Sequence, residues 1–253
     1  MHNTNRTNPF LRAVMAGAVF AVLGTVAIAA PVQQTKQQMP TSATLSAKQA
    51  AIPLIAAATA TSDMPRVRTA LAAGLNAGLT VSETKEILVH LYAYAGFPRS
   101  LNALGELMKL VEERRKGGIV DQPGREPSRP VATGDALVAV GTANQTRISG
   151  QPVKGPLFDF APVINQFLQA HLFGDIFERD NLDWQSRELA TVGALAAPTG
   201  LEAQLKSHMN ASLNVGLTLA QMRQVVDVLR KAGNAGAADR ASAALDALPA
   251  AKK

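Results

Sequence analysis

The sequence contains no cysteine, and this absence excludes several kinds of chemistry. Disulfide bonds, thiolate catalysis, cysteine-ligated metal sites and thiol peroxidase activity all require the sulfur atom of that side chain. Aromatic residues are also scarce, at 4% of the chain, and Ala, Leu and Val supply most of the apolar content. Because β-sandwiches usually rely on aromatic and β-branched residues, this composition favours an all-α fold.

Neither charge nor hydrophobicity is extreme along the chain. The 253 residues are 47% hydrophobic and 17% charged, which leaves enough apolar material for a packed core and excludes wholesale disorder. The length suits one large domain or two small ones. The chain lacks a basic stripe with interleaved aromatic residues, so we do not expect it to bind nucleic acid.

The N-terminal segment has the three parts of a secretory signal peptide. A polar start with Arg6 and Arg12 leads into an apolar run from Ala13 to Ala29, which ends in the small-residue pattern that signal peptidase cleaves. We therefore predict that residues 1–29 are a cleaved signal peptide and that the protein is periplasmic or secreted. An uncleaved membrane anchor is the alternative, although the run is short for a stable span.

The segments after this run are predicted to be free of the membrane. Removal of residues 1–29 takes away two arginines and no acidic residue, so the net charge falls from +6 to about +4. No later segment is long and apolar enough to cross a bilayer. Residues 30–42 are rich in Gln, Pro and Thr and are predicted to be a flexible lead-in.

Capping residues and apolar periodicity predict two series of helices separated by a long irregular connection. In the first unit, residues 43–115, Ser46 caps the first helix, and Thr80 or Ser82 caps the third. Residues 116–157 contain several glycines and prolines and no sustained helical period, so we predict a linker there. The second unit covers residues 158–250. The predicted helices are 45–60, 65–77, one that ends at 95, 98–115, 158–177, 184–197, 201–215, 219–231 and 235–248.

An internal repeat connects the two series. Residues 73–80, AGLNAGLT, match residues 211–218, ASLNVGLT, in the shared pattern A-x-L-N-x-G-L-T. Asn and Gly end one helix, with the Gly in a left-handed conformation, and Thr begins the next helix. Two copies of a helical hairpin unit are the simplest explanation.

The two copies differ most at their titratable positions. Each copy has titratable residues where the other has small or neutral ones, which predicts one composite site shared between the halves. Drift of an ion pair is the alternative interpretation. The aligned pairs are Glu86 and Gln224, His90 and Val228, Arg187 and Ala50, Glu188 and Ala51, and His208 and Ala70.

Glu86, His90 and Tyr94 are each four residues apart and lie along one face of their predicted helix. A carboxylate one turn away can orient an imidazole and raise its basicity, which is a common way to prepare a general acid or base. A buried hydrogen bond that only steadies the helix is the alternative. The histidines have no H-x-x-x-H or H-x-H spacing, so no metal site is predicted.

Residues 86–98, EILVHLYAYAGFP, resemble the E-x-x-x-H-x-x-x-Y-A-G-x-P signature of the carboxymuconolactone decarboxylase family. The second half is similar to the same family through residues 171–179, HLFGDIFER, and residues 187–190, RELA. It is also similar through His208 and the repeat that follows it. The resemblance covers about residues 43–110 and 157–232.

This resemblance implies an all-helical, alkylhydroperoxidase D-like fold in two tandem units. It also implies association through helices, so we expect a homo-oligomer, either a trimer of two-unit chains or a larger assembly. The peroxidase members of the family use a C-x-x-C pair, which this sequence lacks. Decarboxylase members need no cofactor, and none is expected here.

On this basis we expect cofactor-free decarboxylation, or a related acid–base reaction, of a small carboxylated lactone. The proton donor is His90 or His208, with Glu86 orienting His90. A non-catalytic, small-molecule-binding oligomeric scaffold is the second hypothesis. The residues expected to bind the substrate, each arginine and aromatic with a structural role as its alternative, are Arg187, Arg179, Glu188, Tyr94, Arg99 and Trp184.

Overall fold

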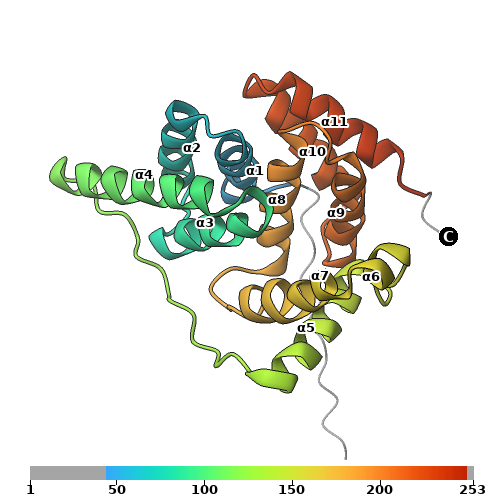
Figure 1. Ribbon diagram of the computed structural model, residues 1–253. Coiled ribbons are helices and arrows are strands. Elements are labelled where there is room, and N and C mark those ends of the chain that lie inside the picture. The colour runs from blue at the N-terminus through green and yellow to red at the C-terminus, as the bar shows by residue number, and fades with distance from the viewer. Residues whose placement is uncertain (1–43, 250–253) are drawn as a thin grey trace, which may run out of the picture. The chain divides into compact units, whose positions relative to one another are not determined.

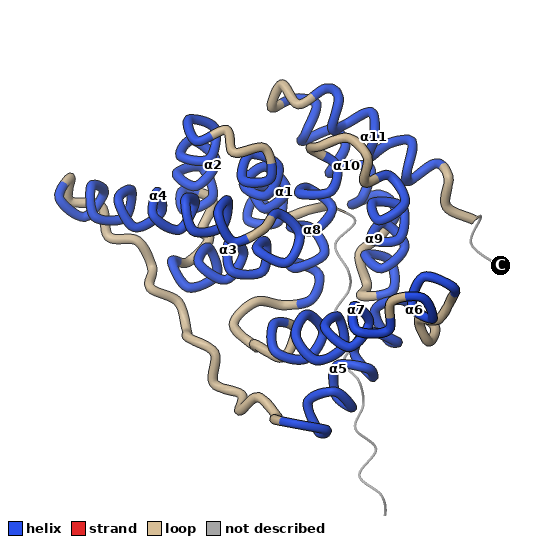
Figure 2. The backbone as a smooth tube through the Cα atoms, in the orientation of Figure 1, coloured by secondary structure: helices blue, strands red, loops and turns tan. Residues whose placement is uncertain are grey.

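The computed structural model describes residues 44–249, and every regular element in that range is a helix (Figures 1 and 2). The prediction of an all-α fold is therefore confirmed for this part of the chain. The predicted signal peptide and the predicted lead-in lie outside the described residues. Within residues 44–249, no helix has the length and apolarity needed to cross a membrane.

Local sequence explains where several helices begin and end. Ser46, Thr80 and Thr218 each accept a hydrogen bond from the backbone amide three residues later. The side-chain oxygen of the Gln or Glu at that later position accepts one from the backbone amide of the capping residue. Gly78 and Gly216, in the repeated A-x-L-N-x-G-L-T pattern, have φ angles of +95° and +99°. The helices are α1 (Ala47–Ala60), α2 (Met64–Asn76), α3 (Val81–Ala95), α4 (Phe97–Lys116), α5 (Gly134–Ser149), α6 (Pro156–Phe160), α7 (Pro162–Phe167), η1 (Leu168–Ile176), α8 (Trp184–Ala196), α9 (Glu202–Asn214), α10 (Leu219–Lys231) and α11 (Ala235–Asp246).

The order of helices occurs twice, first as α1 to α4 and again as α8 to α11. α1 and α8 pack along each other at the centre, α3 lies against α8, and α10 lies against α1 (Figure 1). Each half therefore contributes a helix to the packing of the other. One apolar core runs through both halves, and all described residues belong to one compact unit.

The central contact between α1 and α8 is close because Gly193 has no side chain. A Cβ atom at this position would lie 2.5 Å from the carbonyl oxygen of Pro53 and 2.7 Å from its Cα. Alanines on both helices, including Ala56 and Ala190, are fully buried at the same contact. Small residues therefore set the distance between α1 and α8, the two helices at the centre of the fold.

The prediction of an irregular connection over residues 116–157 is wrong in its second part. Residues 134–149 form α5, which packs along η1. A Cβ at Gly141 would lie 1.7 Å from the carbonyl oxygen of Gln169, so this glycine allows α5 and η1 to touch at their backbones. Glycines and β-branched residues lower intrinsic helix propensity, and tertiary packing, which a local pattern does not contain, outweighs that preference here.

The single helix predicted over residues 158–177 is instead three consecutive elements. Pro162 has no backbone amide to donate and begins α7 as a separate helix after α6. From Leu168 to Ile176 the chain forms a π-helix, η1, which is a wider turn than the 3.6-residue period used for the prediction.

We predict that Gly193→Ala lowers the free energy of unfolding by about 1–3 kcal/mol, because the new methyl group forces α1 and α8 apart. Gly105→Ala is the matched control. Gly105 lies within α4, and a methyl group added there would meet no neighbouring atom within 4 Å, so this change is expected to stabilise by about 0.4–1 kcal/mol. Urea unfolding of both variants checks the pair, and equal midpoints would contradict the packing argument.

Candidate functional site

Three helices bring titratable residues from both halves together, because α3 packs against α8 and α8 packs against α9. Direct hydrogen bonds and ring contacts connect the side chains across these helices. We call the group the polar cluster. Its members are Glu86, His90 and Tyr94 of α3, Arg187, Glu188 and Thr191 of α8, and His208 of α9.

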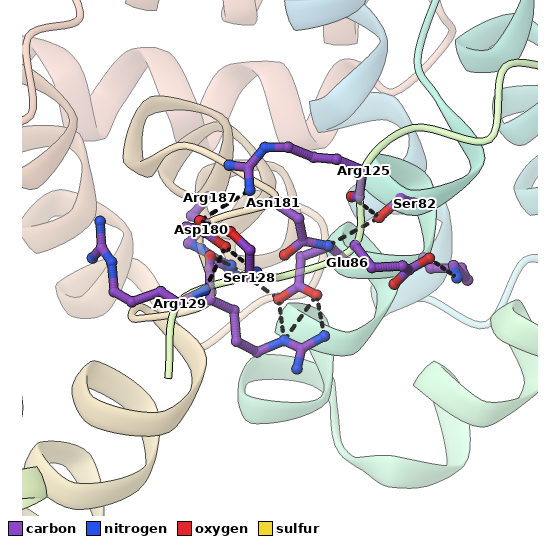
Figure 3. A network of polar contacts seen from close by, with 11 residues as sticks. Ser82, Glu86, Arg125, Ser128, Arg129, Asp180, Asn181 and Arg187 are labelled. Carbon is purple, nitrogen blue, oxygen red and sulfur yellow. Dashed lines mark hydrogen bonds and ion pairs between the residues drawn. The ribbon is translucent and has the colours of Figure 1, made fainter. Parts of the chain in front are cut away.

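Glu86, which is only 1% exposed, accepts hydrogen bonds from two arginines of the second half. Arg179 Nε lies 2.9 Å from both carboxylate oxygens, and Arg187 Nη2 lies 2.9 Å from Oε1 (Figure 3). Burial raises the pKa of Glu86, but the hydrogen bonds and charges of the two arginines outweigh burial and lower it. Glu86 is therefore an anion that ties α3 to α8 and to the segment before α8.

This arrangement corrects the predicted contact between Glu86 and His90. No hydrogen bond joins Glu86 to His90 among the described residues, because the arginines occupy the carboxylate. Arg179 and Arg187, expected to hold a substrate carboxylate, hold the internal carboxylate of Glu86, and their contact with a substrate stays a prediction. Arg187 is fully buried, and its Nε and Nη1 have no hydrogen-bond partner in the described part of the chain.

His90 is fully buried and contacts α8 through Thr191. The Thr191 hydroxyl donates to the backbone carbonyl of Arg187 at 3.0 Å, so it accepts from His90 Nε2–H at 2.8 Å. Nδ1 then carries the lone pair and has no partner among residues 44–249. Burial, followed by the charge of Arg187, holds the pKa of His90 well below its usual value, so the imidazole is neutral.

His208 forms the only acid–imidazole pair of the polar cluster. Its Nδ1 lies 2.8 Å from Glu188 Oε2, and the Glu188 carboxylate is fully buried whereas the His208 side chain is 17% exposed. The carboxylate that orients a histidine is thus Glu188, on the neighbouring helix, and not Glu86 on α3. Glu188, predicted to bind substrate, makes this contact through Oε2, and its contact with a substrate stays a prediction.

Tyr94 lies next to both imidazoles of the polar cluster. Its ring centroid is 5.1 Å from that of His90 and 5.4 Å from that of His208. The hydroxyl lies near Thr191 but makes no hydrogen bond of normal geometry within the described residues. Burial, and then the charge of Glu188, raise the pKa of Tyr94 far above its usual value, so the phenol is neutral and keeps its proton.

Arg99 and Trp184 do not join the polar cluster. Arg99 lies at the exposed start of α4 and donates to the carbonyl of Ala95 at 3.0 Å. Trp184 donates to the carbonyl of Phe177 at 3.2 Å, and Arg147 lies 4.7 Å above its ring. Both have the structural roles that were the alternative for these residues.

Sequence reasoning missed Thr191, which lies one helical turn after Arg187 and on the same face of α8. It also missed a strap, residues 121–129, that crosses the start of α3. Asp180 binds this strap by accepting from the amide and the hydroxyl of Ser128 at 2.8 and 3.0 Å (Figure 3). Hydrogen bonds from Ser128, chiefly from its amide, lower the pKa of Asp180. The strap therefore holds the segment that presents Arg179 to Glu86.

The aligned position in the other half has no such cluster of charged side chains in the described structure. Gln224, aligned with Glu86, accepts a hydrogen bond from the backbone amide of Leu45 at 2.7 Å. This contact joins α10 to the segment before α1, as Glu86 joins α3 to the segment before α8. The contact at Gln224 therefore joins the same kinds of element as the contact at Glu86, but a neutral amide makes it and not a titratable group.

Most side chains of the polar cluster are buried. Among the side chains of the cluster that form hydrogen bonds, His208 is the most exposed, at 17%. A separate cleft of about 370 Å³ is lined by Arg66, Asn234 and Arg240, at the ends of α2 and α11, away from the cluster. No group of three or more His, Asp or Glu residues in the described chain has the arrangement of a metal site.

Comparison with known families shows a match to part of the chain. The model of the carboxymuconolactone decarboxylase family matches residues 162–249, the part of the chain that contains Arg187, Glu188 and His208. This bears out the resemblance for the second half, while membership of the first half stays a prediction. No curated protein matches the chain.

We predict that Glu86→Gln lowers the free energy of unfolding by about 3–5 kcal/mol, because Arg187 is left as an uncompensated buried cation. Glu126→Gln serves as the control. Glu126 pairs with Lys85 but is 63% exposed, so its loss is expected to change stability by less than about 1 kcal/mol. Similar unfolding midpoints for both variants, measured in urea, would contradict the importance of the buried pair.

The neutral, buried state of His90 predicts a loss of stability in acid. The unfolded chain binds a proton at His90 near pH 6.5 and the folded chain does not, so stability is present above that pH and falls below it. The free energy of unfolding is therefore expected to decrease progressively as the pH is lowered below 6.5. His90→Phe removes this component from the pH dependence of unfolding, whereas His171→Gln, at an exposed histidine, keeps it. A wild-type slope in His90→Phe would refute the assignment.

Proposed function

We propose that the protein is a cofactor-free acid–base enzyme of the carboxymuconolactone decarboxylase superfamily, since residues 162–249 match the model of that family. Its proposed reaction is decarboxylation, or a related proton transfer, of a small carboxylated lactone. The polar cluster is the proposed active site. The observation that carries the proposal is the pair formed by Glu188 and His208.

The Glu188–His208 pair has the features of a prepared proton donor. The buried carboxylate accepts from Nδ1–H of the imidazole at 2.8 Å, which fixes the tautomer and leaves Nε2 for proton transfer. His208 is also the partly exposed histidine of the cluster, so it can meet a substrate that enters from solvent. His90 is neutral and fully buried, so we assign it to substrate binding and not to proton donation.

The proposed step breaks the bond between the carboxylate carbon and the ring carbon, and carbon dioxide leaves. The electron pair of that bond passes into the conjugated system that ends at the lactone carbonyl. Protonated His208 then donates its Nε2 proton to the carbon that carries the released electron pair, and the imidazole becomes neutral. The partnerless N–H groups of Arg187 are the proposed donors to the substrate.

The other expectations from the sequence enter this proposal as follows. The enzyme is proposed to act after export, and to assemble as a homo-oligomer, with the substrate differing from that of the namesake decarboxylase because of location. Thiol peroxidase chemistry is not proposed because the chain has no cysteine. A scaffold that binds a small molecule without turnover is the competing function.

His208→Gln and Glu188→Gln are each expected to reduce turnover of a carboxylated lactone by about 10²–10⁴-fold, because general acid catalysis contributes that much. Carbon dioxide release from a panel of such lactones is the measurement. His171→Gln is the matched control, since His171 also pairs with a carboxylate, Asp175, at 2.7 Å, but lies on the exposed surface of η1.

Three results separate the hypotheses. Loss of turnover in the two cluster variants, with the control unchanged, supports the acid–base enzyme. Full turnover in His208→Gln contradicts it. Thermal stabilisation by a lactone with no product in any variant supports the scaffold.

A further inference from the structure

The polar cluster contains an unusual concentration of buried polar atoms without partners. His90 Nδ1, the Tyr94 hydroxyl, Arg187 Nε and Nη1, and Glu188 Oε1 make no hydrogen bond within the described residues. In folded proteins most buried polar atoms are paired, because an unpaired one destabilises the fold. Because the unpaired atoms lie on four neighbouring side chains, they point to a bound molecule that supplies the missing hydrogen bonds.

The chemistry of these atoms defines what the molecule must offer. Arg187 Nε and Nη1 are donors and need acceptor oxygens. Glu188 Oε1 is an acceptor, and His90 Nδ1 is an acceptor because its Nε2–H is given to Thr191. The neutral Tyr94 hydroxyl can donate or accept. The ligand must accordingly carry acceptor oxygens and at least one hydroxyl proton.

The net charge of the polar cluster together with Arg179 limits the charge that the ligand can carry. Arg179 and Arg187 balance Glu86 and Glu188, and His90 and Tyr94 are neutral. With His208 protonated as the proposed acid, the site carries one net positive charge, which a single carboxylate neutralises. A dicarboxylate would leave a negative charge in a buried site, which is unfavourable.

We propose that the polar cluster binds a small hydroxymonocarboxylate, with the carboxylate on Arg187 and the hydroxyl donating to His90 Nδ1 or Glu188 Oε1. The inference rests on the proposed function, because it places this ligand in the same site, and it adds a requirement for a substrate hydroxyl. Lactones with a free hydroxyl and one carboxylate are the corresponding substrate class. His90 is then a specificity-determining residue.

Glycolate and acetate are the probes, because each carries one carboxylate and they differ by one hydroxyl group. Binding to the full chain is measured by ligand-detected NMR titration. We expect glycolate to bind at least about tenfold more tightly than acetate, the effect of one hydrogen bond to a buried polar group. His90→Phe and Glu188→Gln are expected to reduce this preference, and His171→Gln to preserve it.

Equal affinities for glycolate and acetate, or no binding of either, overturn the inference. So does a glycolate preference that persists in both cluster variants. These outcomes leave the proposed function standing if lactone turnover still depends on His208. Conversely, a glycolate preference that depends on His90, together with lactone turnover that is unchanged in His208→Gln, supports the inference and refutes the proposed acid–base role.

Discussion

The buried carboxylate of Glu86 is the interaction on which the site depends. It neutralises Arg187 in the interior and Arg179 at the edge, and so joins α3 of the first half to α8 of the second. Neither arginine has an acidic partner of equal burial in its own half within the described residues. Because an unpaired buried charge is strongly destabilising, the position of α3 on α8, and with it the approach of His90 and Tyr94 to His208, is specified by this ion pair.

Much of the helical framework was predictable because its signals are local. Ser46, Thr80 and Thr218 cap helices through side-chain bonds within one turn, and Gly78 and Gly216 end helices through a backbone conformation that glycine prefers. α5 was missed because its stability comes from contact with η1, made close by Gly141. Such a contact leaves no periodic pattern in the segment itself.

For the polar cluster, the sequence predicted which residues come together better than it predicted which of them form hydrogen bonds with each other. Comparison of the two halves singled out Glu86, His90, Arg187, Glu188 and His208, and the structure brings all of them together. The spacing on α3 favoured a bond between Glu86 and His90, yet the packing of α3 on α8 pairs Glu86 with Arg187 and His90 with Thr191. Partners on other helices compete with partners one turn away, and only the three-dimensional arrangement decides between them.

The bond between Gln224 and the amide of Leu45 has a consequence for which substitutions this part of the fold can accept. An amide at this position retains the mechanical link that a carboxylate makes in the other half, and needs no arginine beside it. Substitutions around Gln224 therefore need to preserve only this hydrogen bond and the packing of α10 against α1. A substitution at Glu86 must in addition keep the charges of Arg179 and Arg187 balanced.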